Sequence, residues 1–155
     1  MSYSELKRWL YKGNHPNFIA RGLNRGWAII HSLGVAPNYF ITMEVVGRKS
    51  SKTISFPLAM VSSGGERYVV SMLGKDAEWV KNIIAAGGKA TIKHGKVEHV
   101  ILEEIPTDQR PPILKLYLQK APGARPHIPV DKDAPLDEFE AIAPDYPVFR
   151  VTTAD

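Results

Sequence analysis

Cysteine is absent from this chain of 155 residues, and so are other features that mark particular classes of protein. Without cysteine there is no disulfide framework and no thiolate metal site, and a reducing compartment is expected. No run of about 18 apolar residues occurs, and the N-terminus lacks the apolar segment of a signal peptide. These absences predict a soluble, cytoplasmic protein.

The common catalytic signatures are also missing. The chain has no G-x-S-x-G elbow, no P-loop, no H-E-x-x-H and no G-x-G-x-x-G. Glu103 and Glu104 are neighbours on a predicted strand, so their side chains face opposite ways. No metal site is predicted, because the histidines are scattered without carboxylates at ligand spacing. The sequence therefore favours ligand binding, or a cofactor that brings its own reactivity. The five histidines are His15, His31, His94, His99 and His127.

Positive charge is concentrated near the N-terminus. The formal net charge is +4, but residues 1–55 hold eight cationic and two acidic residues, a local charge of +6. Such a surface implies an anionic partner, which can be a phosphorylated cofactor, a nucleic acid or an acidic membrane face. Nucleic acid is not expected, because the cations are not interleaved with aromatic residues in a reading motif.

Length and composition predict one domain over residues 1–155, since apolar residues make up 44% and charged residues 23%. Helical periodicity predicts N-terminal helices within about 4–33, of which the amphipathic 4–12 could contact a membrane, cover a pocket or pack on its own domain. Alternating and apolar patterns predict strands at 39–46, 54–61, 67–73, 89–94, 96–105 and 148–152. Further helices are predicted at 76–86, 112–119 and 135–143, and an irregular connection at 121–129.

The strands are joined mostly by short turns, without regular βαβ alternation. This arrangement favours an α+β fold built on a small antiparallel barrel or curled sheet, with helices attached. A doubly wound parallel sheet is not expected.

The turn between the first two predicted strands has an unusual composition. Residues 47–53 combine a glycine with three cations and three hydroxyl side chains. Glycine allows close approach of the backbone, and the cations and hydroxyls are donors for phosphate. The turn is therefore a candidate anion site, although composition alone favours a solvated basic turn over an anion site. The polar residues are Arg48, Lys49, Ser50, Ser51, Lys52 and Thr53.

The motifs around this turn resemble one protein family over about residues 39–105. The runs 44–50, 56–58, 65–71 and 85–88, with Trp79-x-x-Asn82, resemble the deazaflavin (coenzyme F420)-dependent nitroreductases. The segments 121–130 and 147–150 resemble an actinobacterial subgroup. The resemblance implies a split β-barrel of the FMN-binding, flavin-reductase-like type. It also implies hydride transfer from reduced F420 to an activated enone, a quinone or a nitroaromatic acceptor.

The resemblance also implies roles for particular residues. The turn would hold the phosphate and acidic tail of the coenzyme, and residues further along would line the deazaflavin ring. For Trp79 the alternative is a core aromatic residue, and for Asn82 an amide on the helix surface. The implied cofactor-binding residues are Gly47, Arg48, Lys49, Ser50, Lys52, Pro57, Ser71, Met72, Trp79 and Asn82.

The sequence departs from the family pattern at three places. Ser51 stands where the family has a second glycine, and Ile54 where it often has an arginine. The serine that polarises the substrate in some relatives aligns with Met72, with Ser71 one residue earlier. The proton donor therefore stays open among backbone amides, water and four hydroxyl side chains. The hydroxyl candidates are Ser71, Tyr68, Tyr117 and Tyr146, and packing is the alternative role for each tyrosine.

Two other interpretations keep the same barrel. One is a flavoprotein that uses FMN, and the other is a non-catalytic binder of a hydrophobic ligand. F420 carries a phosphodiester and a polyglutamate tail, whereas FMN carries one phosphate, so the basic N-terminal third favours F420. The expected acceptor is small, planar and apolar, and the protein is expected to be a monomer or a homodimer.

Overall fold

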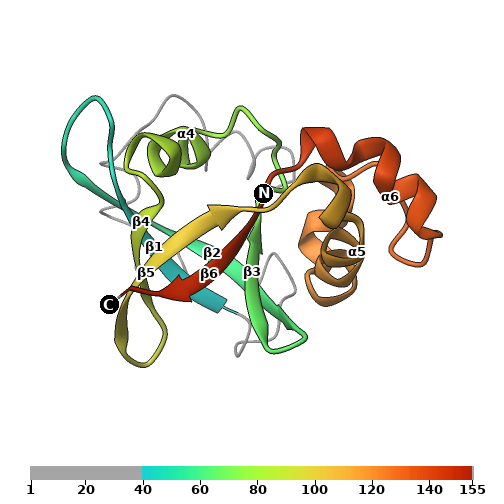
Figure 1. Cartoon of the computed structure of the whole chain (residues 1–155), viewed down its shortest axis with the longest axis horizontal. Coiled ribbons are helices and arrows are strands. Elements are labelled where there is room, and N and C mark those ends of the chain that lie inside the picture. The colour runs from blue at the N-terminus through green and yellow to red at the C-terminus, as the bar shows by residue number, and fades with distance from the viewer. Residues whose placement is uncertain (1–39, 155) are drawn as a thin grey trace.

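The computed structural model describes residues 40–154, which form a barrel of strands with helices against one side and one end (Figure 1). The predicted N-terminal helices, and with them the predicted membrane contact, lie outside the described residues. The strands are β1 Phe40–Val46, β2 Thr53–Ser63, β3 Glu66–Val70, β4 Lys89–Lys93, β5 Val97–Glu104 and β6 Val148–Thr153. The α-helices are α4 Glu78–Ala85, α5 Pro111–Lys120 and α6 Leu136–Ile142. The 3₁₀ helices are η3 Thr107–Gln109, η4 Pro122–His127 and η5 Ala143–Asp145.

The six strands close on themselves in the order β1-β2-β3-β6-β5-β4, and every neighbouring pair is antiparallel. The predicted α+β class and antiparallel barrel are therefore confirmed. The predicted elements from residue 40 onward are all present, with ends that shift by a few residues. Among the described helices, none has the length and apolar character needed to cross a bilayer.

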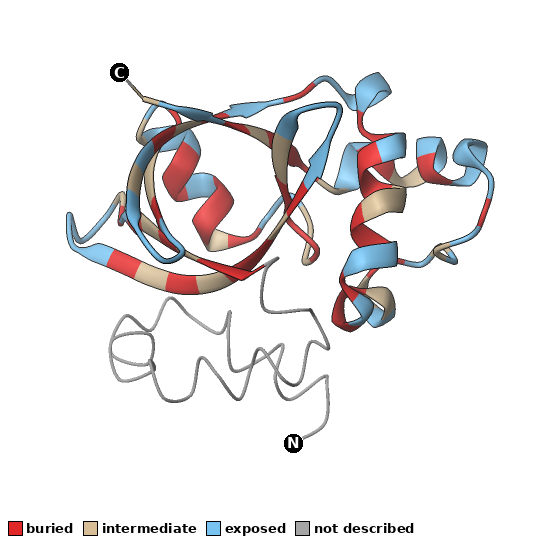
Figure 2. Cartoon of the chain, turned by 90° about the horizontal axis from the view of Figure 1, so that it is seen from below, coloured by how far each residue is buried: buried red, intermediate tan, exposed pale blue. Residues whose placement is uncertain are grey.

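The interior of the barrel is filled by alternate residues of its strands. Ile41, Met43 and Val45 of β1 point inward, as does the alternate set in the first half of β2. Helix α4 lies over one end of the barrel and seals it with the buried side chains of Trp79 and Val80 (Figures 1 and 2). This end of the barrel also carries the loop between β1 and β2.

A second core lies outside the barrel wall. Ala59 and Val61, in the second half of β2, face outward and pack with Phe40 in a cluster that includes buried residues of α5 and α6. The alternation predicted for β2 holds along its first half, where the outward Ser55 and Pro57 are half-buried, but the outward Ala59 and Val61 are buried as well. The first half of β2 therefore packs into the barrel interior, and its second half contributes side chains to the barrel interior and to the second core.

Arg110 fastens the helical layer to the end of β5. Arg110 is 6% exposed, and its guanidinium donates to the carbonyl oxygens of Ile105 (Nε, 3.1 Å) and Ala143 (Nη1, 2.9 Å). A third bond runs from Nη2 to Glu104 Oε2 at 2.8 Å. One side chain therefore joins β5, the start of α5 and η5.

A second arginine links three strands of the barrel. Arg67 on β3 forms a bidentate pair with Glu98 on β5, with N–O distances of 2.8 and 2.7 Å. Thr153, on the intervening strand β6, donates to the same carboxylate at 2.6 Å. These donors, Arg67 first, lower the pKa of Glu98 to about 2.

Candidate functional site

The loop between β1 and β2 is compact and internally hydrogen-bonded. The amide of Gly47 donates to the carbonyl oxygen of Lys52 at 2.8 Å, and the amide of Ser51 donates to that of Gly47 at 2.9 Å. Ser50 Oγ accepts a bond from the Lys52 amide at 3.2 Å. These contacts fix the backbone and leave the side chains of Lys49 and Lys52 exposed. The loop therefore presents two exposed ammonium groups on a backbone whose conformation is fixed by hydrogen bonds.

Two positions of the loop have tight backbone requirements. A Cβ atom on Gly47 would lie 2.6 Å from Ser50 Oγ and 3.1 Å from Ile54 Cδ1, so a larger residue here would have to displace the Ser50 hydroxyl. Ser51 has a φ of 60°, the left-handed region that glycine adopts without strain. Ser51 thus keeps the conformation that a glycine would favour. Ile54 is buried in the barrel interior rather than exposed beside the loop.

Arg48 is held against helix α4 by Asn82. The side-chain oxygen of Asn82 accepts two bonds, from the Arg48 amide at 3.1 Å and from Arg48 Nη1 at 2.8 Å. Asn82 is only 2% exposed, so it is not the surface amide that was the alternative. The structure thus brings together two residues that the sequence placed at the same site from 34 positions apart.

Glu78 is a component of this site that the sequence did not assign to it. Its Oε2 lies 2.8 Å from Arg48 Nη1, and the two side chains are 32% and 21% exposed. In sequence, Glu78 is an acidic residue in the first turn of α4, where it favours the helix N-terminus. Its pairing with Arg48 depends on how the loop docks on the helix, which no local pattern indicates.

The residues implied to line the ring occupy different environments. Trp79 is buried, with ring centroids 5.8 Å from Phe56 and 5.6 Å from Phe149, so it has the core position named as its alternative. Pro57 is half-buried on the outward face of β2, opposite Thr42 of β1. Of these, Pro57 alone combines an outward strand position with partial exposure.

The side chains of the two residues after β3 make contacts within the protein. Ser71 is buried, and its hydroxyl donates to the carbonyl oxygen of Gly74 at 2.6 Å. Met72 is buried in the outer core, beside α5. Both side chains therefore stabilise the turn that leads into α4.

The three candidate tyrosines lie on the side of the outer core. Tyr117 is buried there, and Tyr68 is half-buried against the same cluster. The Tyr146 hydroxyl donates to the carbonyl oxygen of His127 at 2.9 Å, and burial, followed by the charge of Asp145, raises the pKa of this phenol. In Figure 1, α5 and α6 lie on the opposite side of the barrel from the β1–β2 loop, so Tyr117 is not brought to the loop.

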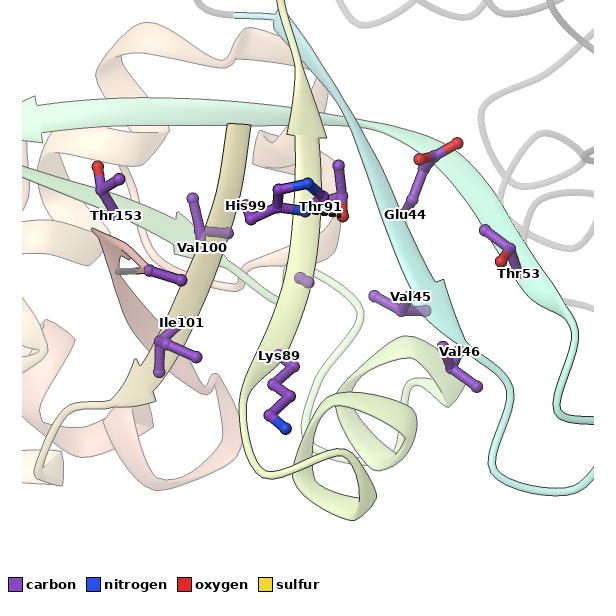
Figure 3. Close-up of a pocket in the computed structure, with 12 residues that line it drawn as sticks. Glu44, Val45, Val46, Thr53, Lys89, Thr91, His99, Val100, Ile101 and Thr153 are labelled. Atoms are coloured by element: carbon purple, nitrogen blue, oxygen red, sulfur yellow. Dashed lines mark hydrogen bonds between the residues drawn. The ribbon is translucent and has the colours of Figure 1, made fainter. Parts of the chain in front are cut away.

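A hollow of about 600 Å³ opens on the barrel wall formed by β1, β4 and β5, with the ends of β2 and β6 (Figure 3). Its lining includes the apolar Val46 and Ile101, with Lys89 beside them. Val46 and Thr53 flank the β1–β2 loop, so the hollow begins where that loop ends. Local pattern reasoning missed it, because five strands contribute to the lining.

Three polar side chains that line the hollow, Thr91, His99 and Glu44, have polar partners. Thr91 Oγ1 lies 3.2 Å from His99 Nδ1 across the β4–β5 pair. Glu44 accepts a bond from Ser55 at 3.1 Å and lies 3.0 Å from Lys93 Nζ. Within residues 40–154, no group of histidine and acidic side chains has the arrangement of a metal site.

Comparison with known proteins bears on the family and on the fold of this chain. The family model described as F420H(2)-dependent quinone reductase matches residues 21–134. A solved F420-H2-dependent reductase (FDR-A) is 21% identical, with 76% of this chain and 97% of that chain covered and a TM-score of 0.51. No protein of curated function matches the chain.

Two further solved structures are similar. One described as an F420 reductase is 12% identical, covers 81% of this chain and 93% of its own, and has a TM-score of 0.52. Another, described as a domain-swapped dimer, is 18% identical with coverages of 86% and 99% and a TM-score of 0.52. At these identities the solved structures establish the shared split-barrel fold.

Proposed function

This chain belongs to the F420H(2)-dependent quinone reductase family, and from that premise we propose that it passes hydride from reduced F420 to a small, planar, apolar acceptor. The family makes it an F420-dependent reductase. The acceptor classes that we propose are quinones, activated enones and nitroaromatic compounds. The observation that carries the proposal is the Arg48 guanidinium, which Asn82 fixes at the head of a cationic loop.

The chemistry of the loop fits the anionic part of F420. We propose that Arg48, Lys49, Ser50 and Lys52 hold the phosphodiester and the acidic tail, with Gly47 allowing the backbone to approach. Arg48 supplies charge-assisted donors, and the two exposed lysines supply mobile ammonium groups. Because Asn82 already orders Arg48, less conformational entropy is lost when a ligand binds.

The outward face of β2 is a suitable place for one edge of the deazaflavin ring. We propose that Pro57 lines the deazaflavin, and that Trp79 supports it from inside the barrel by packing against Phe56. A bound 5-deazaflavin supplies the hydride, so the protein must mainly align ring and acceptor. Ser71 and Met72 would hold the adjoining turn in place rather than touch the reacting atoms.

The proposed source of the proton is water. The hydroxyls of Ser71 and Tyr146 already donate to backbone carbonyls, and the raised pKa of Tyr146 opposes its ionisation. Removing either hydroxyl should therefore alter stability more than the rate of the chemical step. Ser71→Ala and Tyr146→Phe test this assignment, and a large loss of kcat with intact folding in either variant would contradict it.

The decisive experiment is a titration of the protein with F420 and, in parallel, with FMN, followed by tryptophan quenching. We expect F420 to bind and FMN to bind much more weakly. Arg48→Ala should raise the Kd for F420 by about ten-fold to a hundred-fold, as expected for a lost bond between charged groups worth about 1.5–3 kcal/mol. Lys132→Ala, which removes a cation beside Asp133, is the matched control and should leave the Kd unchanged.

A second candidate function rests on the hollow beside the loop. Its volume and the apolar side chains of Val46 and Ile101 suit a hydrophobic ligand that is bound without reaction. Turnover separates the two candidates. Oxidation of reduced F420 in the presence of a quinone favours the reductase, whereas tight binding of a hydrophobic ligand without turnover favours the binder.

A further inference from the structure

Arg48 is shared between two residues of helix α4. Its Nη1 lies 2.8 Å from Asn82 Oδ1 and 2.8 Å from Glu78 Oε2. The bond to Asn82 is reinforced by a second one from the Arg48 backbone amide to the same oxygen. Asn82 is therefore the fixed anchor, and Glu78 supplies only charge.

The contact with Glu78 differs in kind from the contact with Asn82. Glu78 Oε2 is buried and, among the described residues, accepts no hydrogen bond of acceptable geometry, although it is within ion-pair distance of Arg48. An ion pair without an aligned hydrogen bond is weaker than one between a guanidinium and a well-placed anion. Arg48 and Glu78 are 21% and 32% exposed, so part of each side chain faces solvent although Glu78 Oε2 itself is buried.

We propose that Glu78 competes with anionic ligands for Arg48. The Glu78 carboxylate occupies the guanidinium until an anionic ligand displaces it, and it excludes ligands that bring only one anionic group. This inference rests on the proposed function, because it concerns the same loop. It assigns a selectivity role to a residue that the sequence did not place in the site.

The charges of the loop explain the selectivity. A ligand with a single anionic group can pair with Arg48 only by separating Arg48 from Glu78. One ion pair then replaces another, and little binding free energy is gained. A ligand with several anionic groups also reaches Lys49 and Lys52, which are exposed and form no ion pair with an acidic side chain among residues 40–154. The phosphodiester and carboxylates of F420 belong to this second class. Released Glu78 keeps a favourable place in the first turn of α4.

The test compares Glu78→Gln with the wild type, using inorganic phosphate and F420 as separate probes. We expect Glu78→Gln to bind phosphate about ten-fold more tightly, because a partly exposed like charge has been removed from the site. The affinity for F420 should rise by a smaller factor, so the preference for F420 over phosphate falls. Glu140→Gln makes the same charge change on α6, away from the loop (Figure 1), and should alter neither affinity.

Each outcome decides something specific. If Glu78→Gln binds phosphate no better than the wild type, or binds it more weakly, then Glu78 supports Arg48 and the inference is wrong. If neither protein binds F420 but Glu78→Gln gains phosphate affinity, the inference holds and the proposed function fails. A uniform gain for both probes also overturns the selectivity role. A thermal unfolding curve for each variant verifies that the fold is intact.

Discussion

At the scale of single residues, Ser51 stands out because its backbone is in the left-handed region. A residue with a Cβ atom loses about 1–2 kcal/mol there, and glycine avoids this loss at an entropic cost of about 0.5–1 kcal/mol in the unfolded chain. We therefore expect Ser51→Gly to stabilise the protein by roughly 0.5–1 kcal/mol, measured by urea unfolding.

Ser50→Gly is the matched control for that change. Ser50 does not have a positive φ, and its hydroxyl oxygen accepts a bond from the Lys52 amide. Its replacement should destabilise the protein slightly. If Ser51→Gly lowers stability as much as Ser50→Gly does, the φ of Ser51 carries no strain and the explanation is wrong.

The candidate site could be predicted from sequence only as far as the residue types allowed. The composition of the loop indicated an anion site, and the family resemblance added Asn82. The pairing of Arg48 with Glu78 could not be predicted, because it depends on the docking of a loop against a helix 30 residues later. For Trp79 the sequence left two environments open, and the contacts with Phe56 and Phe149 show the buried one.

At the scale of secondary-structure elements, the carboxylate of Glu98 links β5 to β3 and β6. Its pKa in the folded protein, about 2, lies below the ordinary value of 4.5. The stabilisation is therefore complete above about pH 4.5 and is lost as the pH falls toward 2. We expect the free energy of unfolding of the wild type to fall across this window.

Glu98→Gln tests the assignment. The variant should be less stable than the wild type at pH 6, and the difference should shrink as the pH approaches 2. Unfolding by urea at several pH values measures both curves. Glu138→Gln, an exposed acid on α6, is the control and should follow the wild type. A constant difference at all pH values would contradict the role of the Arg67–Glu98 pair.

Arg110 makes a comparable link between the barrel and the outer helices. Arg110→Met leaves the carbonyl oxygens of Ile105 and Ala143 without their donor in a buried place. We expect a loss of about 2–4 kcal/mol in the free energy of unfolding. Arg150→Met removes an arginine that is 37% exposed and pairs with Glu103 at the surface. Its effect should stay within about 1 kcal/mol, and similar losses in both variants would refute the distinction.

At the scale of the whole molecule, the uneven distribution of charge should affect how the coenzyme arrives. Residues 1–55 carry a charge of +6, and F420 is strongly anionic. We expect the association rate constant for F420 to fall on the order of ten-fold between low and high salt. Stopped-flow fluorescence measures this rate. A rate that does not depend on ionic strength would show that the basic segment does not steer the coenzyme.

The architecture was more predictable than the site because each strand has a recognisable pattern in its own stretch of sequence. Alternation along Ile41, Met43 and Val45 indicated a strand with one buried face, and the short turns indicated antiparallel pairing. The closure of the barrel, and the burial of Ala59 and Val61 on the opposite face of β2, depend on contacts between distant segments. No single stretch of sequence contains that information.

The ring of strands has a consequence for the behaviour of concentrated solutions. Each of the six described strands is hydrogen-bonded to a neighbour on both sides, so the described sheet has no free edge strand. A free edge is the usual template on which a second chain adds a strand and aggregation begins. For this part of the chain, aggregation by strand addition first requires the barrel to open. The shelf life of the purified protein should therefore follow its rate of unfolding.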